Sequence, residues 1–343
     1  MIVQYFRSNS TNPDKKVQTQ PILFQIHLCY SLDMEKESKE KGRDRKMKTV
    51  VVDIGGTAIK SGVFVYSKVI DLRTRPTRAE RGADEVIRTV IEVISGYEDY
   101  EAIGISTTGQ IHVKEGRVLF AGNNIPGYEG TELKRILEDY FHKPVFVEND
   151  VNAAALGEAY FGAGMGVDQF LCLTYGTGIG GGIILNGQLY RGAQYAAGEF
   201  GGILVHPEER NESDIFSGCY ERYASVTALA NRAKKEDASI DCGKAVIDRI
   251  QEPKIDKVVN EWVHEISIGL VTLIHSFNPS LVLLGGAIME QSVIVCRVRA
   301  EVLHMLMEVY QDVQIRPAML GNTAGMYGMA HIADCGLHAT NQM

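Results

Sequence analysis

Residues 173–199 read LTYGTGIGGGIILNGQLYRGAQYAAGE, and together with VVDIGGTAIKSG at residues 51–62 they decide the fold. In each stretch an apolar β-type run enters a glycine-rich turn that carries a threonine, and a second apolar run leaves it. Glycine lets the backbone approach an anion closely, and the exposed N–H groups of such a turn form a concave anion-binding surface. Two loops of this build predict a nucleotide phosphate chain held between two halves of the molecule.

Other phosphate-binding patterns do not fit these loops. The chain has no G-x-x-x-x-G-K-[ST], which excludes a P-loop. Gly176, Gly178 and Gly181 formally give G-x-G-x-x-G, but they lead into residues 182–185, an apolar run typical of a strand. Because the dinucleotide fingerprint requires strand, turn and helix, we exclude that interpretation as well.

Length, composition and charge narrow the class of protein. A chain of 343 residues can form two domains and a sizeable core, and its 45% hydrophobic and 23% charged residues are ordinary for a globular protein. The net charge of −8 argues against nucleic acid as a partner. Six scattered cysteines without a C-x-x-C indicate free thiols in a reducing compartment. With no membrane-length apolar run and no signal-peptide layout, we expect a cytoplasmic protein without a membrane partner.

Residues 1–46 differ from the rest of the chain. They are mostly polar and charge-rich, and residues 34–48 mix Lys, Arg, Glu and Asp without an apolar face. This composition predicts a disordered extension. A second interpretation is that Met47 is the natural start and that residues 1–46 are an over-extended reading of the gene.

From residue 49 onward the hydrophobic pattern is that of an α/β protein. A hairpin followed by alternating helix and strand occurs once in each half, without a sequence repeat strong enough to establish duplication. Strands are expected at 50–54, 61–66, 102–106, 145–147, 170–174, 182–185 and 281–284. Helices are expected at 83–96, 131–140, 152–161 and 262–277.

Six segments in this region resemble the ROK family (repressors, open reading frames and sugar kinases). They occur in the family's order over nearly all of residues 48–335: DIGGT, VENDVNAAALGEAYFGAG, LTYGTGIGGGIILNGQLYRG, AAGEFGG, LVLLGGAIM and LGNTAGMYGMA. The resemblance implies an α/β, actin-like (ribonuclease H-like) two-domain ATPase fold with a central cleft. A small domain at 48–165 would carry the first phosphate loop with the sugar and catalytic residues. A larger domain at 166–343 would carry the second phosphate loop and the adenosine loop, its last helix packing back on the small domain.

The resemblance also implies where ATP and Mg²⁺ bind. In the family the Asp matching Asp53 helps to hold the Mg²⁺ that accompanies ATP, and a carboxylate beside a phosphate loop needs a cation because it would otherwise repel the nucleotide. Asp53 could instead cap the turn, and Lys60 could be a solvated side chain. The expected ATP-binding residues are Asp53, Gly55, Gly56, Thr57, Lys60, Gly176, Thr177, Gly178, Gly285 and Gly286.

Asp150 is the predicted catalytic base. Phosphorylation of a hydroxyl group needs a carboxylate placed to accept the alcohol proton, and Glu148-Asn149-Asp150 lies between a short strand and a helix start. The residues alone leave a second role open, in which Asp150 only caps that helix. In the family the matching Asp is the base and the residue matching Asn149 binds the sugar.

Three further residues resemble the family's sugar ligands, namely Glu199, Glu221 and Asn124. Carboxylate and amide groups suit vicinal hydroxyls because between them they accept and donate hydrogen bonds in pairs. Each of the three could instead stabilise a turn.

The chain departs from the family at a metal site. Members usually continue from the sugar-binding Glu as x-Gly-His and then carry C-x-C-G-x-x-G-C-x-E, binding structural zinc through the His and three Cys. Here Gly202 occupies the His position, Glu212 and Asp214 occupy the first two Cys positions, and Cys219 remains. A structural zinc site needs four ligands, and His206 comes too late in the chain to restore the set alone, so we expect no structural zinc.

These observations favour a sugar kinase that uses ATP and Mg²⁺ to phosphorylate the 6-hydroxyl of a hexose, acting as a homodimer. Glucose is the first expectation, and an N-acylhexosamine such as N-acetylmannosamine or a β-glucoside is the alternative. A sugar-responsive repressor would need an N-terminal helix-turn-helix, and residues 1–46 show no paired amphipathic helices. An inactive sugar-binding relic would be expected to lose Asp150 or a phosphate loop, and the chain keeps them.

Overall fold

Both glycine-rich turns lie at the tips of antiparallel hairpins, as the sequence predicted. β1 (Thr49–Ile54) and β2 (Ala58–Val65) flank the first turn, and β8 (Phe170–Tyr175) and β9 (Ile179–Leu185) flank the second. A strand, not a helix, follows the G-x-G-x-x-G pattern, so the exclusion of a dinucleotide fingerprint is confirmed.

The computed structural model describes residues 47–122 and 124–340. The chain divides between Lys46 and Met47 into two units, and only the second is described below. The extension and alternative start expected at residues 1–46 lie outside the described residues. None of the described helices is long and apolar enough to cross a membrane.

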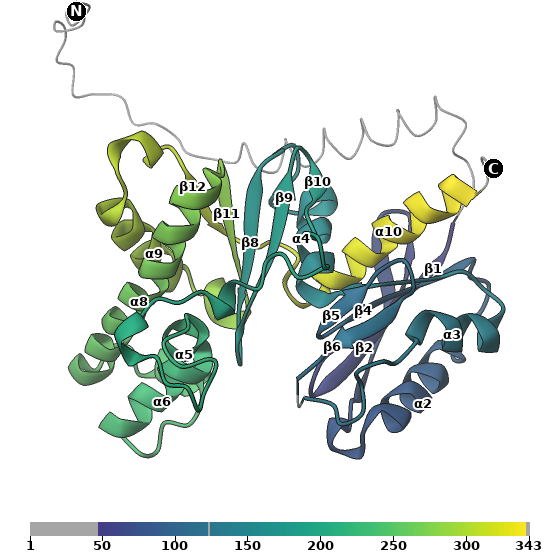
Figure 1. The fold of residues 1–343 in the computed structure, drawn as a ribbon, viewed down its shortest axis with the longest axis horizontal. Coiled ribbons are helices and arrows are strands. Elements are labelled where there is room, and N and C mark those ends of the chain that lie inside the picture. Colours follow the sequence, from purple (N-terminus) through teal and green to yellow (C-terminus); the bar gives the residue numbers. More distant parts are fainter. Residues whose placement is uncertain (1–46, 123, 341–343) are drawn as a thin grey trace, which may run out of the picture. The chain divides into compact units, whose positions relative to one another are not determined.

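Each half contains a five-stranded sheet with one plan (Figure 1). The first sheet has the order β3-β2-β1-β4-β7, adding β3 (Lys68–Pro76), β4 (Ala102–Thr107) and β7 (Val145–Asn149). The second has the order β10-β9-β8-β11-β12, adding β10 (Gln188–Leu189), β11 (Leu281–Gly285) and β12 (Gln314–Pro317). In both, an antiparallel hairpin leads into parallel strands. The hairpin-then-helix-and-strand pattern that occurs in each half of the sequence therefore corresponds to the same sheet topology in each half.

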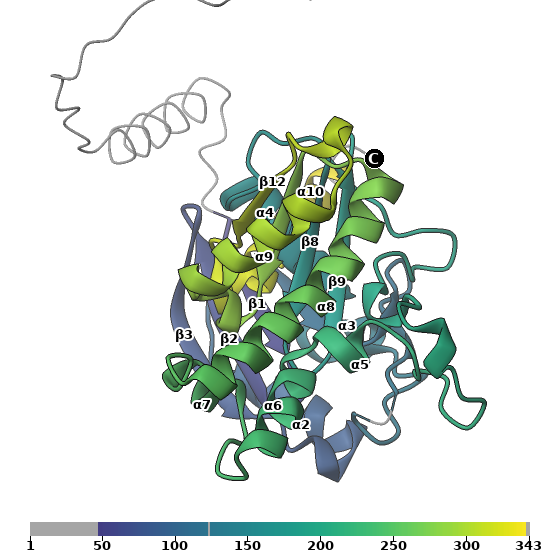
Figure 2. The same ribbon diagram turned by 90° about the vertical axis from the view of Figure 1, so that its left-hand side faces the viewer.

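One face of each sheet is covered by that half's own helices. In the first half α2 (Ala83–Ile94) and α3 (Leu133–Phe141) share a core with inward residues of β1, β4 and β7. In the second half the core includes the short α5 (Glu221–Ala224), α6 (Val226–Glu236) and α7 (Gly243–Asp248), and the longer α8 (Pro253–Phe277) and α9 (Ser292–Met305). Figure 2 shows α8 and α9 side by side. A small separate sheet pairs β5 (Gln110–His112) with β6 (Arg117–Phe120).

Two further helices, α4 (Asp150–Phe161) and α10 (Ala324–Thr340), cover the other faces and pack on each other. α4 joins the core of β8, β9 and β11, whereas α10, the last described element, packs on β1, β4 and β7. The two helices approach very closely: a Cβ at Gly157 would lie 2.2 Å from the Ala324 carbonyl oxygen, and one at Gly328 1.8 Å from that of Ala153. Only glycine permits this approach.

Candidate active site

The strand ends of the first sheet bring three polar side chains into one row. Asp53 of β1 is in register with Ser106 of β4, which is in register with Glu148 of β7. Ser106 Oγ donates a hydrogen bond of 2.9 Å to Asp53 Oδ1. The first turn of α10 lies against this row, since a Cβ at Gly325 would be 3.1 Å from Ser106 Oγ and 3.6 Å from Asp53 Oδ1. In open α/β sheets the carboxyl ends of the strands are where ligands bind.

Asp150 follows this row at the first position of α4 and is not its cap. Asn149 is the N-cap, because its side-chain oxygen accepts hydrogen bonds from the N–H groups of Val151 and Asn152, both at 3.0 Å. Asp150 Oδ1 also accepts from the Val151 N–H at 2.9 Å, so Asp150 supports the start of α4 without being its N-cap residue. Burial, the nearby Asp53 carboxylate and, to a smaller extent, Glu199 raise the pKa of Asp150 to about 7.

The side chain of Asn149 is fully engaged within the protein. Besides capping α4, its Nδ2 donates to the Gly109 carbonyl and to Asp150 Oδ1, each at 3.0 Å. This amide therefore orients the Asp150 carboxylate. The sugar contact expected of Asn149 would have to share or replace one of these hydrogen bonds.

Two carboxylates of the second half complete the acidic cluster of Asp53, Asp150, Glu199 and Glu221. Glu221, at the start of α5, lies next to the second phosphate loop: a Cβ at Gly178 would be 2.9 Å from its Oε2, and one at Gly201 3.0 Å. Burial and the Glu221 carboxylate raise the pKa of Glu199, and Glu199 in turn contributes to the raised pKa of Asp150. The structure thus brings together four of the predicted residues from separate segments of the chain.

The first phosphate loop has an open backbone tip. The Gly55 N–H donates to the Ala58 carbonyl at 3.1 Å, and nothing lies within 4 Å of the position of a Cβ at Gly56. The Thr57 carbonyl accepts from the Thr77 N–H at 3.0 Å, which anchors the turn to the end of β3. Lys60 Nζ is 3.9 Å from Asp53 Oδ2, so the lysine is directed toward the acidic cluster and not into bulk solvent.

The second phosphate loop is tied to the start of α6. The Gly176 carbonyl accepts from the Val226 N–H at 3.0 Å, and the Thr177 carbonyl accepts from Thr227 Oγ1 at 2.8 Å. These hydrogen bonds fix the loop through its backbone carbonyl groups and do not use the side chain of Thr177.

At the turn after β11, backbone conformation and close packing require glycine independently of any ligand. Gly286 has a φ of 98°, and a Cβ there would lie 2.1 Å from the Tyr175 carbonyl oxygen. With Gly285 it lines a cavity of about 40 Å³ that α4 reaches through Glu158 and α10 through Ala324. This places the predicted adenosine loop at the crossing of α4 and α10.

Asn124 has no described contact with the acidic cluster. It is exposed in the loop after β6. Conversely, the sequence reasoning did not assign Ser106, Glu148 or Arg191, which contact the cluster or its neighbours. The signal for Glu148 was present: an acidic residue at the end of an apolar strand, directly before two predicted site residues, will be buried and will require a partner.

In the loop at residues 202–221, the side chains at the positions of the family's zinc ligands differ from those that hold structural zinc. Gly202 offers no side chain, and Asp214 Oδ2 is paired with Arg222 Nη2 at 3.1 Å. Among the four positions matched to the family's ligands, Cys219 offers the one sulfur donor, whereas structural zinc is held by Cys and His donors. The donor set at these positions does not fit the metal.

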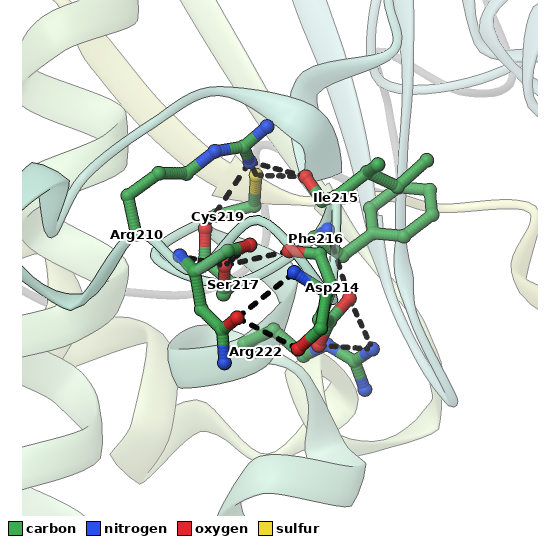
Figure 3. A network of polar contacts seen from close by, with 9 residues as sticks. Arg210, Asp214, Ile215, Phe216, Ser217, Cys219 and Arg222 are labelled. Atoms are coloured by element: carbon green, nitrogen blue, oxygen red, sulfur yellow. Dashed lines mark hydrogen bonds and ion pairs between the residues drawn. The ribbon is translucent and has the colours of Figure 1, made fainter.

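Protein groups hold this loop together instead (Figure 3). Arg210 Nη1 donates to the carbonyls of Ile215 and Ser217 and lies 3.9 Å from Cys219 Sγ. A guanidinium that donates to several acceptors of one loop holds these parts of the loop together.

His206 pairs with two carboxylates. Its Nε2 lies 2.9 Å from Glu265 Oε2 and its Nδ1 3.1 Å from Glu208 Oε1, and the hydrogen bond to Glu265 is the main reason that its pKa is raised. With Glu208 and Glu209 it forms a group of metal-type donors on the surface. Both ring nitrogens, however, face carboxylates, which is the arrangement of an imidazolium and not of a metal ligand.

The acidic cluster does fit a Mg²⁺ ion. Four carboxylates in close proximity repel one another, and oxygen ligands are those that Mg²⁺ prefers. Asp53 has one oxygen, Oδ1, bonded to Ser106, while Oδ2 is 3.9 Å from Lys60. That oxygen is therefore available to a cation, directly or through water.

Comparisons with known proteins agree with this arrangement. The ROK family model matches residues 49–335. A β-glucoside kinase of Listeria innocua is 32% identical over 83% of this chain and 97% of its own, and a glucokinase of Thermotoga maritima is 33% identical over 84% and 97%.

Solved structures give the same result. A ROK glucokinase of Streptomyces griseus in complex with glucose and AMPPNP has a TM-score of 0.75 at 32% identity, covering 84% of this chain and 99% of its own. A putative N-acetylmannosamine kinase of Listeria monocytogenes has a TM-score of 0.75 at 28% identity, covering 83% and 98%. These neighbours confirm the predicted α/β, actin-like ATPase fold, and the chain belongs to the ROK family, among its sugar kinases.

Proposed function

We propose that this ROK-family sugar kinase transfers the γ-phosphoryl group of ATP to the 6-hydroxyl of a hexose, with glucose as its substrate. The observation that carries the proposal is the position of Asp150. It lies among Asp53, Glu199 and Glu221, and Asn149 Nδ2 holds its carboxylate at 3.0 Å. A carboxylate whose pKa is raised to about 7 is suited to accept the proton of an attacking hydroxyl group.

The remaining residues divide between the two substrates. Glu199 and Glu221 accept hydrogen bonds from sugar hydroxyls, with Asn149 and Asn124 as further ligands. The two glycine turns and Lys60 hold the ATP phosphates, and Gly285 and Gly286 border the adenosine. Asp53 holds Mg²⁺, which when bound would neutralise charge on the transferring phosphoryl group.

Two specific observations favour a second substrate class. The curated β-glucoside kinase is as similar to this chain as the glucokinase, and Gly202 lacks the imidazole that contacts the sugar in most members of the family. A site without that imidazole has more room beside the sugar ring. A β-glucoside is therefore the second candidate, and an N-acylhexosamine is the third.

Absence of structural zinc is part of the same proposal. It is supported by the donor set at Gly202, Glu212, Asp214 and Cys219 and by the hydrogen bonds of Arg210 within the loop. The homodimer and the cytoplasmic location remain predictions.

An ADP-release assay across a sugar panel tests the proposal. The panel comprises glucose, N-acetylmannosamine, cellobiose and 6-deoxyglucose, which lacks the accepting hydroxyl group. We expect the highest kcat/KM for glucose and no turnover of 6-deoxyglucose. Turnover of cellobiose alone would move the substrate to the β-glucosides, and equal ADP release with 6-deoxyglucose would contradict phosphorylation at the 6-position.

A further inference from the structure

The segment 190–198, which joins β10 to Glu199, contacts the first half of the molecule at two points. Arg191 Nε donates to Glu148 Oε2 at 2.7 Å, and the rings of Tyr195 and His112 meet edge to face with centroids 4.9 Å apart. These residues come from opposite halves of the molecule, so the segment bridges them beside the acidic cluster.

The segment 190–198 forms a loop closed by a backbone hydrogen bond, and Glu199 follows it directly. The Ala197 N–H donates to the Arg191 carbonyl at 3.1 Å. Gly198, at φ 94°, then passes so close to Gly181 that a Cβ would lie 2.3 Å from the Gly181 carbonyl oxygen. A displacement of Arg191 would therefore be transmitted to Glu199 through a short, constrained stretch of backbone.

Arg191 is the ion-pair partner of the buried Glu148 side chain. The Glu148 side chain is 2% exposed, and among the described residues Arg191 is the cation that pairs with it. Its second oxygen, Oε1, accepts from the Asn149 N–H at 3.0 Å and from Asn152 Nδ2 at 3.3 Å. Breaking a buried ion pair by removing one partner leaves the other charge without compensation.

The contacts of Glu148 connect Arg191 to the candidate base. Glu148 holds the backbone of Asn149, whose side chain in turn holds Asp150 Oδ1. We propose that Arg191 is a positioning residue for the sugar site. Its ion pair with Glu148 holds the backbone that carries Glu199 against the turn that carries Asn149 and Asp150. The inference rests on the proposed function, because it requires these residues to grip one sugar.

Positioning of this kind affects the two substrates differently. Sugar hydroxyls are held from both halves, whereas the backbone turns that hold phosphates are fixed by their own hydrogen bonds. A misplacement of about 1 Å at reacting groups can cost about 100-fold in rate. Loss of Arg191 should therefore change the kinetics of the sugar far more than those of ATP.

The test compares Arg191→Met, Arg191→Lys, Glu148→Gln and the double variant Arg191→Met/Glu148→Gln in steady-state assays with varied sugar and varied ATP. Arg191→Met should lower kcat/KM for the sugar by about 10- to 100-fold and change KM for ATP by less than about 2-fold. Arg191→Lys should recover part of the loss, since lysine keeps the charge but not the planar geometry. The double variant should be no worse than Arg191→Met, because both changes remove one interaction.

A matched control and a second variant keep the result interpretable. Arg249 has a side chain of similar exposure, 31% against 30% for Arg191. Its Nε also lies 2.7 Å from a carboxylate oxygen, that of Glu252, so Arg249→Met is the matched control. It should leave sugar kinetics unchanged. If Arg191→Met fails to fold, the double variant, which has no unpaired buried charge, carries the measurement, and failure of both to fold contradicts a positioning role.

Three outcomes separate the two proposals. A parent enzyme that phosphorylates no sugar overturns the proposed function and this inference with it. An active parent whose Arg191→Met variant keeps its sugar kcat/KM overturns this inference alone. Equal losses for sugar and ATP, or strictly additive losses in the double variant, would also overturn it.

Discussion

Asp150 carries the strongest prediction at the scale of single residues. Asp150→Asn should keep the fold and lower kcat by about 10²–10⁴, the range for losing a general base. Because a base acts when deprotonated, kcat/KM of the parent should fall as the pH drops below the raised pKa of Asp150, about 7. The measurement is a pH–rate profile of both proteins, and equal turnover of mutant and parent would contradict the assignment.

The same carboxyl group should reduce the stability of the fold. Its folded pKa, about 7, lies above the ordinary value of 3.8 for an aspartate, so the folded state binds the proton more tightly and stability decreases as the pH rises through that interval. Asp150→Asn should therefore be more stable than the parent at pH 8, by about 1–2 kcal/mol, and nearly equal to it at pH 4. Urea unfolding at the two pH values measures this. Asp139→Asn, at a carboxylate with 72% of its side chain exposed, controls for the loss of one charge.

Sequence patterns could identify single site residues but not the bonds between them. Asp53 and Asp150 stand in motifs with a chemical meaning, and both lie in the acidic cluster. The N-cap, however, is Asn149 and not Asp150, because the choice between adjacent polar residues depends on backbone angles that no pattern specifies. Arg191 could not be assigned, since its partner Glu148 is distant in sequence.

At the scale of elements, hairpins and buried strands were predictable and the helices of the second half were less so. The expected helix 262–277 begins earlier, at Pro253, a proline in the first turn, and its apolar periodicity already includes Ile255, Val258 and Val259. α9 was not predicted, and α10 was expected only as a last helix without bounds, from the resemblance to the family. α10 contains three glycines and is packed on both sides, so it lacks the one-sided pattern on which periodicity depends.

The glycines between α4 and α10 lead to a prediction about these two helices. Gly328→Ala would place a methyl group about where the Ala153 carbonyl oxygen lies, forcing the helices apart. We expect a loss of about 2–4 kcal/mol of stability and reduced activity, because Asp150 begins α4. Thermal melts and kinase assays check both. Gly202→Ala, where nothing lies within 4 Å of the added Cβ, should leave the melting temperature unchanged and serves as the control for stability.

At the scale of the whole molecule, the metal content separates this chain from the family's usual pattern. Elemental analysis of the purified protein should find no stoichiometric zinc, and a chelator should leave its melting temperature unchanged in the absence of Mg²⁺ and ATP. Near one zinc per chain that resists mild chelation would contradict this prediction. Arg210→Ala should lower stability, since it removes the hydrogen bonds to Ile215 and Ser217.

The position of α10 also constrains how the protein can fold during synthesis. The sheet of the first half is encoded early, by residues 49–149, yet the face bearing Val51 is covered by Met326 and Met329 of the last described helix. A ribosome must therefore translate the entire second half before the first half can bury that face. Until then the nascent chain presents an apolar sheet surface of the kind that chaperones bind. Stalling translation between residues 166 and 320 should give a chain whose first half is more sensitive to protease than in the finished protein.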